Sequence, residues 1–351
     1  MTVQAITKKT LEYLRIPAVV GHEHGFMRYV RRDLRTLGLR TELRKGVLAV
    51  HGKNPFSQIV CAHIDRHGLI SIGGAQYAYA AQYVKEIKYG EENKSSRREL
   101  QNIAARFEGE RVYAYDPMTL HSLGEGGIET CEPCMDGGDS LFYVHDIEID
   151  ELGIPLAYAR QGSFENGYLK GQIDNAVCVA TLRVLLENGF EGTALFTTEE
   201  EIGKSWTHIA RYLRLYEVET DRLIVLDTSP YTDKAPIEQG YVIFRNRDFS
   251  EIFNPVLVHA LKNRCENLGL PYQVKDEYLL AKGKTVEQLG STELGRLIQN
   301  EKDAGGNPRW NGATIQIPTM MYHTSYETAS EIAINNFYTF LKDILIDNPI
   351  G

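Results

Sequence analysis

Apolar residues recur every three or four positions along several stretches of the chain, which is the spacing of helices that bury one face. These stretches are residues 8–16, 24–37, 175–186, 206–213, 254–268, 292–299 and 331–345. Short continuous apolar runs, typical of buried strands, lie between them at 47–51, 58–62, 193–197, 223–226 and 314–317. Helices that alternate with buried strands predict an α/β core.

The segment 68–167 has a different pattern. Short apolar stretches at 111–115, 141–144 and 156–159 are separated by turn-like clusters at 90–96, 124–127 and 137–139. Only residues 97–107 have helical spacing. We therefore predict a three-layer αβα domain with a mixed sheet, built from 1–67 and 168–351, and a mostly-β domain inserted at 68–167.

Composition narrows the class of protein. The 351 residues are 43% hydrophobic and 24% charged, as in globular proteins. Lys and Arg number 38 against 47 Asp and Glu, so the net charge of −9 argues against a nucleic-acid partner. No apolar run approaches the roughly 18 residues of a membrane span. Five scattered cysteines and an N-terminus without a long apolar stretch lead us to expect a cytoplasmic protein.

Potential metal ligands follow four of the predicted strands. His63 ends the second strand, the run Glu199–Glu201 follows the third, Asp227 follows the fourth and His323 follows the last after a turn. Asp174 stands before a predicted helix. Ligand sites in open α/β sheets lie beyond the carboxyl ends of the strands, so these side chains are expected to converge.

Two histidines and three carboxylates suit a pair of divalent ions such as zinc or cobalt. Two dications bring +4, while Asp174, Glu201, Asp227 and a bridging hydroxide bring −4. One carboxylate must bridge the two ions. Each signal alone is weak, because an acid before a helix is usually an N-cap and a Glu pair is usually a solvated turn. Their joint occurrence after separate apolar strands is what indicates a site.

Two further acids have predicted supporting roles. Glu200 is left over as a general base. Asp65 is placed to accept the second ring N–H of His63 and fix its tautomer.

Four motifs together resemble the co-catalytic dimetal aminopeptidases of clan MH, specifically the glutamyl and tetrahedral aminopeptidase family. They are the segments 16–23, 63–69, 200–203 and 317–327, and the resemblance covers nearly the whole chain. It implies that His63 and Asp227 bind one metal, that Glu201 and His323 bind the other, and that Asp174 bridges them. The family pattern Glu-Glu-x-Gly, ending here at Gly203, makes Glu200 the catalytic acid or base and Glu199 a flanking residue.

The sequence departs from the family pattern around the ligands without losing any of them. Arg66 and His67 replace an acidic and an apolar residue after His-x-Asp, and Met320 and Met321 precede the last histidine. Asn175-Ala176 and Thr292-Glu293 are further departures. We take Arg66 and His67 as candidate substrate contacts, with His67 as an alternative extra metal ligand.

The resemblance implies a metal-dependent aminopeptidase that uses two zinc ions, with cobalt or manganese as alternatives. Peptides would be its substrates, and the inserted domain would mediate self-association, from a dimer up to a dodecamer. The rivals are a carboxypeptidase or an N-acyl amino acid deacylase of the same clan, with Arg66 binding a substrate carboxylate, and a non-catalytic assembly protein. A glycosidase would have no use for the two histidines. Cys131 and Cys134 are either loop thiols or part of a zinc site completed by His121 or His145.

Overall fold

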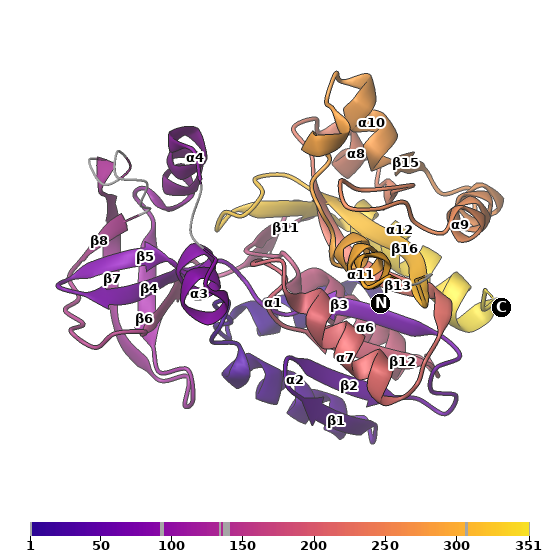
Figure 1. Cartoon of the computed structure of the whole chain (residues 1–351), viewed down its shortest axis with the longest axis horizontal. Coiled ribbons are helices and arrows are strands. Elements are labelled where there is room, and N and C mark those ends of the chain that lie inside the picture. Colours follow the sequence, from indigo (N-terminus) through magenta and orange to yellow (C-terminus); the bar gives the residue numbers. More distant parts are fainter. Residues whose placement is uncertain (1, 92–94, 133–134, 136–140, 306–307, 351) are drawn as a thin grey trace.

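The computed structural model describes residues 2–91, 95–132, 135, 141–305 and 308–350. Its centre is an eight-stranded mixed sheet in the order β1-β2-β12-β3-β13-β16-β14-β15 (Figure 1). The four strands β12, β3, β13 and β16 run parallel in the middle. The strands are β1 (Arg40–Arg44), β2 (Val47–His51), β3 (Ile59–His63), β12 (Thr193–Thr197), β13 (Thr220–Pro230), β14 (Val242–Phe244), β15 (Tyr272–Val274) and β16 (Trp310–Thr319).

Helices cover both faces of this sheet. The crossover through α6 runs from β3 to β12 and the crossover through α7 runs from β12 to β13, in opposite directions, so right-handed connections place the two helices on opposite faces. Helices α1 and α12 pack with α6, and α11 packs with α7. These helices are α1 (Thr2–Leu14), α6 (Ala176–Glu187), α7 (Ser205–Leu215), α11 (Glu293–Asp303) and α12 (Glu331–Lys342). The predicted three-layer α/β core is confirmed.

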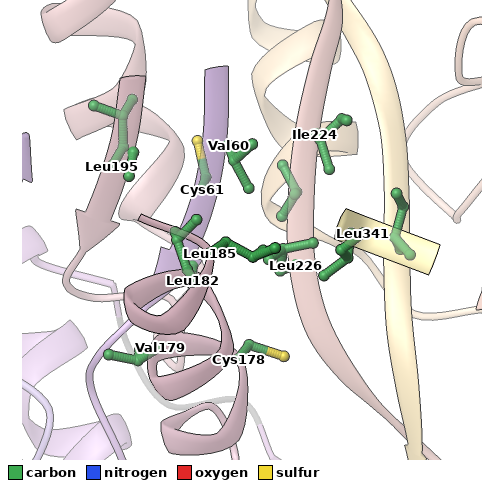
Figure 2. Packing of buried hydrophobic residues seen from close by; sticks show 14 of the residues in the cluster. Val60, Cys61, Cys178, Val179, Leu182, Leu185, Leu195, Ile224, Leu226 and Leu341 are labelled. Atoms are coloured by element: carbon green, nitrogen blue, oxygen red, sulfur yellow. The ribbon is translucent and has the colours of Figure 1, made fainter. Parts of the chain in front are cut away.

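The core is densest between α6 and the parallel strands. All residues of α6 except the last are buried, so this helix is apolar on every side. Figure 2 shows Cys178, Leu182 and Leu185 of α6 packed toward Val60 of β3 and Leu226 of β13. Because β3 and β12 are buried along their whole length, the edge of the sheet where they end is held rigidly.

A separate barrel projects from one end of the sheet, at the left of Figure 1. It closes in the order β4-β5-β8-β7-β6-β9, encloses its own apolar core, and lies within the segment predicted as an insertion. Its strands are β4 (Leu69–Gly73), β5 (Gln76–Tyr79), β6 (Arg111–Tyr115), β7 (Ser122–Thr130), β8 (Leu141–His145) and β9 (Pro155–Tyr158). Two helices accompany it, α3 (Ala80–Tyr89) and α4 (Arg97–Phe107).

One prediction in this segment is wrong. Residues 124–127 form part of β7 rather than a turn, and they pair with β6 and β8. A Cβ atom at Gly126 would lie 1.9 Å from the carbonyl oxygen of His145, so the glycine lets two strands approach closely. The cluster 137–139 and Cys134 lie outside the described residues, as does part of the cluster 90–96.

The remaining elements complete the chain. They are α2 (His24–Thr36), β10 (Ser163–Glu165), β11 (Tyr168–Gly171), α8 (Ala235–Glu238), α9 (Pro255–Asn267), α10 (Lys275–Ala281), η1 (Val286–Gln288), β17 (Glu327–Ser330) and η2 (Asp343–Asp347). Strands β10, β11 and β17 form a small sheet that holds the segments before Asp174 and after His323 together. Among the described residues, no helix is both long and apolar enough to cross a bilayer.

Candidate metal centre

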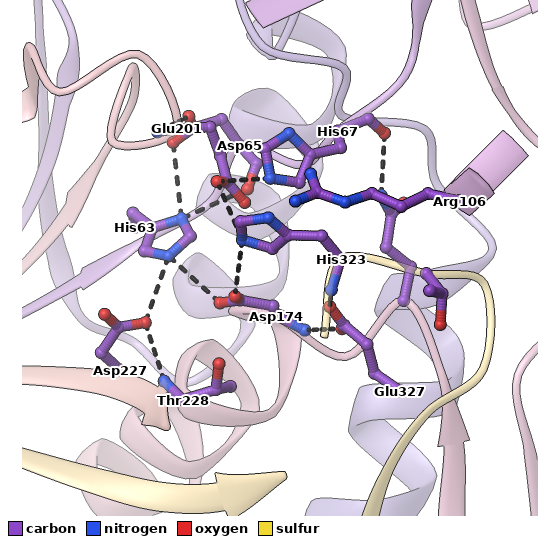
Figure 3. Close-up of polar contacts among 12 residues, drawn as sticks. His63, Asp65, His67, Arg106, Asp174, Glu201, Asp227, Thr228, His323 and Glu327 are labelled. Carbon is purple, nitrogen blue, oxygen red and sulfur yellow. Dashed lines mark hydrogen bonds and ion pairs between the residues drawn. The ribbon is translucent and has the colours of Figure 1, made fainter. Parts of the chain in front are cut away.

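The predicted ligands come together at the carboxyl edge of the parallel strands (Figure 3). His63 is the last residue of β3, and Glu201 follows β12. Asp227 lies inside β13, which continues four residues further than predicted, to Pro230. His323 lies in the loop between β16 and β17. Asp174 precedes α6, but Asn175 is the N-cap residue and makes no side-chain cap, so Asp174 is not an ordinary helix cap.

Asp174 lies between the two histidines. Its Oδ1 is 3.3 Å from Nε2 of His63, and its Oδ2 is 3.7 Å from Nε2 of His323. His63 Nε2 is also 3.4 Å from Asp227 Oδ1, and His323 Nε2 is 3.4 Å from Glu201 Oε2. Two ligand atoms on one tetrahedral ion with bonds of about 2.0 Å lie about 3.3 Å apart. These separations therefore match two ion sites that share Asp174.

Several polar atoms at this edge have no hydrogen-bond partner among the described residues. Within the described part of the chain, Asp174 Oδ1, Glu201 Oε1 and both ring nitrogens of His323 are buried without a hydrogen bond. Such atoms are costly to bury unless something binds them. Nitrogen and carboxylate oxygen atoms in this number are the donor set of divalent zinc, cobalt or manganese, so the residues present fit a pair of such ions.

The electrostatics of the carboxylates lead to the same conclusion. Burial, reinforced by the charge of Asp227, raises the pKa of Asp174 above its ordinary value and the pKa of Glu200 to about 8. Burial and the neighbouring Asp174 raise the pKa of Glu201 well above its usual range. Without added positive charge Glu200 would hold its proton at neutral pH, and Asp174 and Glu201 would be harder to ionise than ordinary carboxyl groups. Two dications would supply that charge and keep the carboxylates ionised.

The histidines at this edge differ in charge state. Burial opposes the charged form of His63, but close contacts with the carboxylates of Asp174, Asp227 and Asp65 raise its pKa well above the usual value. Burial, together with nearby positive groups, lowers the pKa of His67 and His323 well below it. His67 and His323 are therefore neutral at pH 7, which is the state in which an imidazole binds a metal.

Asp65 connects two parts of the site. Its carboxylate accepts the backbone N–H groups of Glu200 and Glu201, at 3.1 and 2.9 Å, and so fixes the loop after β12. Nδ1 of His63 lies 3.2 Å from the carbonyl oxygen of Asp65 and 3.5 Å from its Oδ1. The predicted contact with His63 is thus present, and the contact with the glutamate loop is an addition that the sequence did not indicate.

Two other glutamates have clear structural roles. Glu199 faces away from the site, where it contacts Lys88 and Tyr89 of α3 and lies 3.0 Å from His208. Glu327 is fully buried and accepts the backbone N–H of Asp174 at 2.7 Å and of His323 at 2.6 Å. Glu327 therefore holds two candidate ligands in place. Glu327 lies at the end of one of the four family motifs, but no sequence pattern predicted that it would hold the ligands in place.

The structure separates the two candidate substrate contacts. Arg66 is buried away from the cavity, where its guanidinium lies over the ring of Phe26 and donates to the carbonyl of Ile16. His67 lines the cavity, and its Nε2 lies 2.7 Å from Glu201 Oε2. Of the two methionines before His323, Met320 packs against the small cluster around Ile237, and Met321 is exposed.

The candidate ligands open into a cavity of about 960 Å³ between the helices that accompany the barrel and the edge of the central sheet. Gln82 and Arg106, from α3 and α4, form part of one wall. The opposite wall includes Arg245 and Lys275, both buried. Across the described ranges, neither of these two cations forms an ion pair with a carboxylate. No pattern in the sequence had indicated them, because they lie on short elements that fold back over the sheet edge.

Residues 160–339 match the family described as M42 glutamyl aminopeptidase. The chain belongs to this family. The match includes Asp174, Glu201, Asp227 and His323, and the predicted family resemblance is confirmed. Family membership supports peptidase activity that depends on metal. No match was found among curated protein sequences.

Solved structures of similar fold accompany this family match. This M42 peptidase has a TM-score of 0.70 to a TET aminopeptidase from a marine-sediment Thaumarchaeota archaeon, at 17% identity over 98% of this chain and 97% of that one. An aminopeptidase from the archaeon Desulfurococcus kamchatkensis also gives 0.70, at 16% identity over 98% and 94%. The Pyrococcus horikoshii TET1 peptidase, described as assembling into a tetrahedron or a large octahedral shell, gives 0.68 at 16% identity over 97% and 99%. At these identities the likeness shows the shared fold.

Proposed function

We propose that this M42 peptidase is an aminopeptidase that releases N-terminal residues with the help of two divalent metal ions. The observation that carries the proposal is the convergence of five ligand side chains at ion-like separations around the two oxygens of one aspartate. His63 and Asp227 would hold one ion, Glu201 and His323 the other, and Asp174 both. Zinc suits this set of nitrogen and oxygen donors, with cobalt and manganese as alternatives.

Glu200 is the proposed general base. It lines the cavity beside the ligands, and Asp65 fixes its backbone. Two bound divalent ions would lower the pKa of a water molecule and polarise the scissile carbonyl. Glu200 would then take the proton of the attacking water and later deliver it to the leaving amine.

Arg245 and Lys275 favour an acidic side chain at the N-terminal position of the substrate. Burial, with the nearby charge of Arg245, lowers the pKa of Lys275 to about 7, so a bound carboxylate would stabilise its charged form. The family description names glutamyl substrates, in agreement with such a pocket. The same two cations would also accept the terminal carboxylate of a carboxypeptidase substrate or of an N-acyl amino acid. For this reason the position of the free amine must be tested directly.

The first experiment is metal analysis of the purified protein together with an activity panel. The panel contains p-nitroanilides of Glu, Asp, Leu and Lys, the N-acetylated Glu compound, and a peptide blocked at its N-terminus. About two metal ions per chain, with chelator-sensitive hydrolysis of free-amine Glu and Asp compounds, is the expected result. Activity confined to blocked substrates would move the function to the carboxypeptidase or deacylase class. Absence of both metal and turnover would favour the non-catalytic alternative.

We also propose that the barrel domain mediates self-association. Large apolar side chains are exposed on it and on its helix α3, including Ile87, Met118 and Leu152. Light scattering coupled to size-exclusion chromatography should give a dimer or a larger assembly, up to twelve copies. Replacement of Ile87 and Leu152 by Asp should lower the mass. A wild-type monomer at micromolar concentration would contradict this proposal.

A further inference from the structure

His67 lies beside the proposed metal ligands but is not one of the five. Its Nε2 lies 2.7 Å from Glu201 Oε2, and its ring centroid lies 3.8 Å from that of His323. One ligand atom from each of His67, Glu201 and His323 falls within 4.8 Å of the other two. Figure 3 shows the His67 and His323 rings next to each other.

The other ring nitrogen of His67 has a partner that suits metal binding through Nε2. Nδ1 lies 2.5 Å from the hydroxyl oxygen of Tyr79, and Arg106 donates to the same oxygen at 3.4 Å. A histidine that binds a metal through one nitrogen carries its proton on the other and donates it to an oxygen. The Tyr79 oxygen can accept from both neighbours, because a phenolic oxygen has two lone pairs and its own proton is free to turn elsewhere.

We propose that His67 is an additional ligand of the metal ion bound by Glu201 and His323, held in the required tautomer by Tyr79. This inference rests on the proposed two-metal function. The second ion would then have four protein ligands, including the bridging Asp174, while the ion at His63 and Asp227 would have three. Four protein ligands are typical of closed zinc sites, and three leave a position open for water.

The alternative role of His67 is a simple hydrogen bond from Nε2–H to Glu201. The present separation of 2.7 Å is a hydrogen-bond distance, shorter than the about 3.3 Å between two ligands of one tetrahedral ion. Metal loading distinguishes the two roles. A ligand must turn its Nδ1–H toward Tyr79 and move away from Glu201 by about 0.6 Å, whereas a hydrogen-bond donor keeps its distance.

The test compares wild type with His67→Gln, His67→Val and Tyr79→Phe. His51→Gln serves as the matched control, since His51 is a largely buried histidine outside the cavity. Each protein is stripped of metal, checked by circular dichroism, and titrated with zinc in competition with a chelator of known affinity. The expected result is that both His67 variants weaken binding of one zinc at least tenfold and leave the other unchanged, with a smaller loss in Tyr79→Phe. The spectrum of bound cobalt should change in the His67 variants and not in the control.

The outcomes separate this inference from the proposed function. Two zinc ions with affinities unchanged within about twofold in both His67 variants would overturn the ligand role and leave the two-metal peptidase intact. A wild type that binds no zinc would overturn both. A crystal structure of the zinc-loaded protein gives the second readout. A bond of about 2.0–2.1 Å from His67 Nε2 to the ion supports the inference, and a separation beyond 3 Å refutes it.

Discussion

Replacement of Lys275 by Met should stabilise the protein at low pH and weaken its activity toward acidic substrates. Lys275 is 3% exposed, lies over the ring of Tyr231 at 3.4 Å, and donates to the carbonyl of Pro230. Its pKa falls from 10.5 in the unfolded chain to about 7, chiefly because burial disfavours the charged form. Below pH 7, where Lys275 is charged in the folded protein, its burial therefore lowers the free energy of unfolding by up to about 5 kcal/mol.

The sign of the pH dependence follows from proton binding. Between pH 7 and 10.5 the unfolded chain holds a proton at this lysine that the folded chain has released, so unfolding free energy rises with pH over that window. Below pH 7 both states are protonated and the full cost is present. Lys275→Met lacks this dependence, so the variant should be more stable than wild type by up to about 5 kcal/mol at pH 6 and lose this advantage by about pH 10.

Urea unfolding at several pH values between 6 and 9.5 measures this difference, with Lys282→Met, an exposed neighbour, as control. In the activity assay, kcat/KM for a Glu substrate should fall about tenfold to a hundredfold in Lys275→Met, while that for a Leu substrate changes little. A variant that is less stable than wild type at pH 6, or a stability difference that does not vary with pH, would refute the reasoning.

Three further predictions concern glutamates. Glu200→Gln should lower kcat by about 10²–10⁴-fold while elemental analysis still finds wild-type metal content; unchanged turnover would exclude Glu200 as the base. Glu327→Gln should weaken zinc binding about tenfold to a hundredfold in chelator competition, because the neutral amide holds the backbone N–H groups of Asp174 and His323 less firmly, and equal affinity would contradict that role. Burial opposes ionisation of Glu199, but hydrogen bonds with His208, Lys88 and Tyr89 lower its pKa to about 2. Its contribution to stability is therefore complete above about pH 4.5 and is lost as the pH falls toward 2. Glu199→Gln should be less stable than wild type at pH 7, with the gap narrowing in acid unfolding curves; a constant gap would count against the ion pair.

The sequence predicted best the elements that are buried along their whole length. The runs 47–51 and 193–197 coincide with β2 and β12, because a strand covered on both faces must be continuously apolar. In the barrel the pattern failed where backbone packing dominates. The sequence pattern predicts a turn at Gly126, but in the structure this glycine lies in β7 and permits close approach of β8. The helix α3 also has no clear signal, since its apolar face is made largely of alanine.

The candidate ligands could be predicted because they follow predictable strands. Their surroundings could not, since these depend on how distant segments fold back. Lys275 begins α10, a short helix after a three-residue strand, and nothing in its local sequence shows that it reaches the cavity. For Arg66, in contrast, the sequence predicted a place in the cavity that the structure does not show. Its place next to the ligand motif indicated a substrate contact, but the alternation of side chains along the backbone directs it toward Phe26 instead.

Glu199 connects the barrel's helix α3 to the loop that carries Glu200. It lies directly before Glu200, and its carboxylate forms hydrogen bonds with Lys88 and Tyr89 of α3 and with His208 of α7. A displacement of the barrel by even an ångström would have to break these bonds or shift the loop that carries the base. With the proposed self-association through the barrel and the proposed role of Glu200, this buried carboxylate would couple contacts between subunits to the position of the general base.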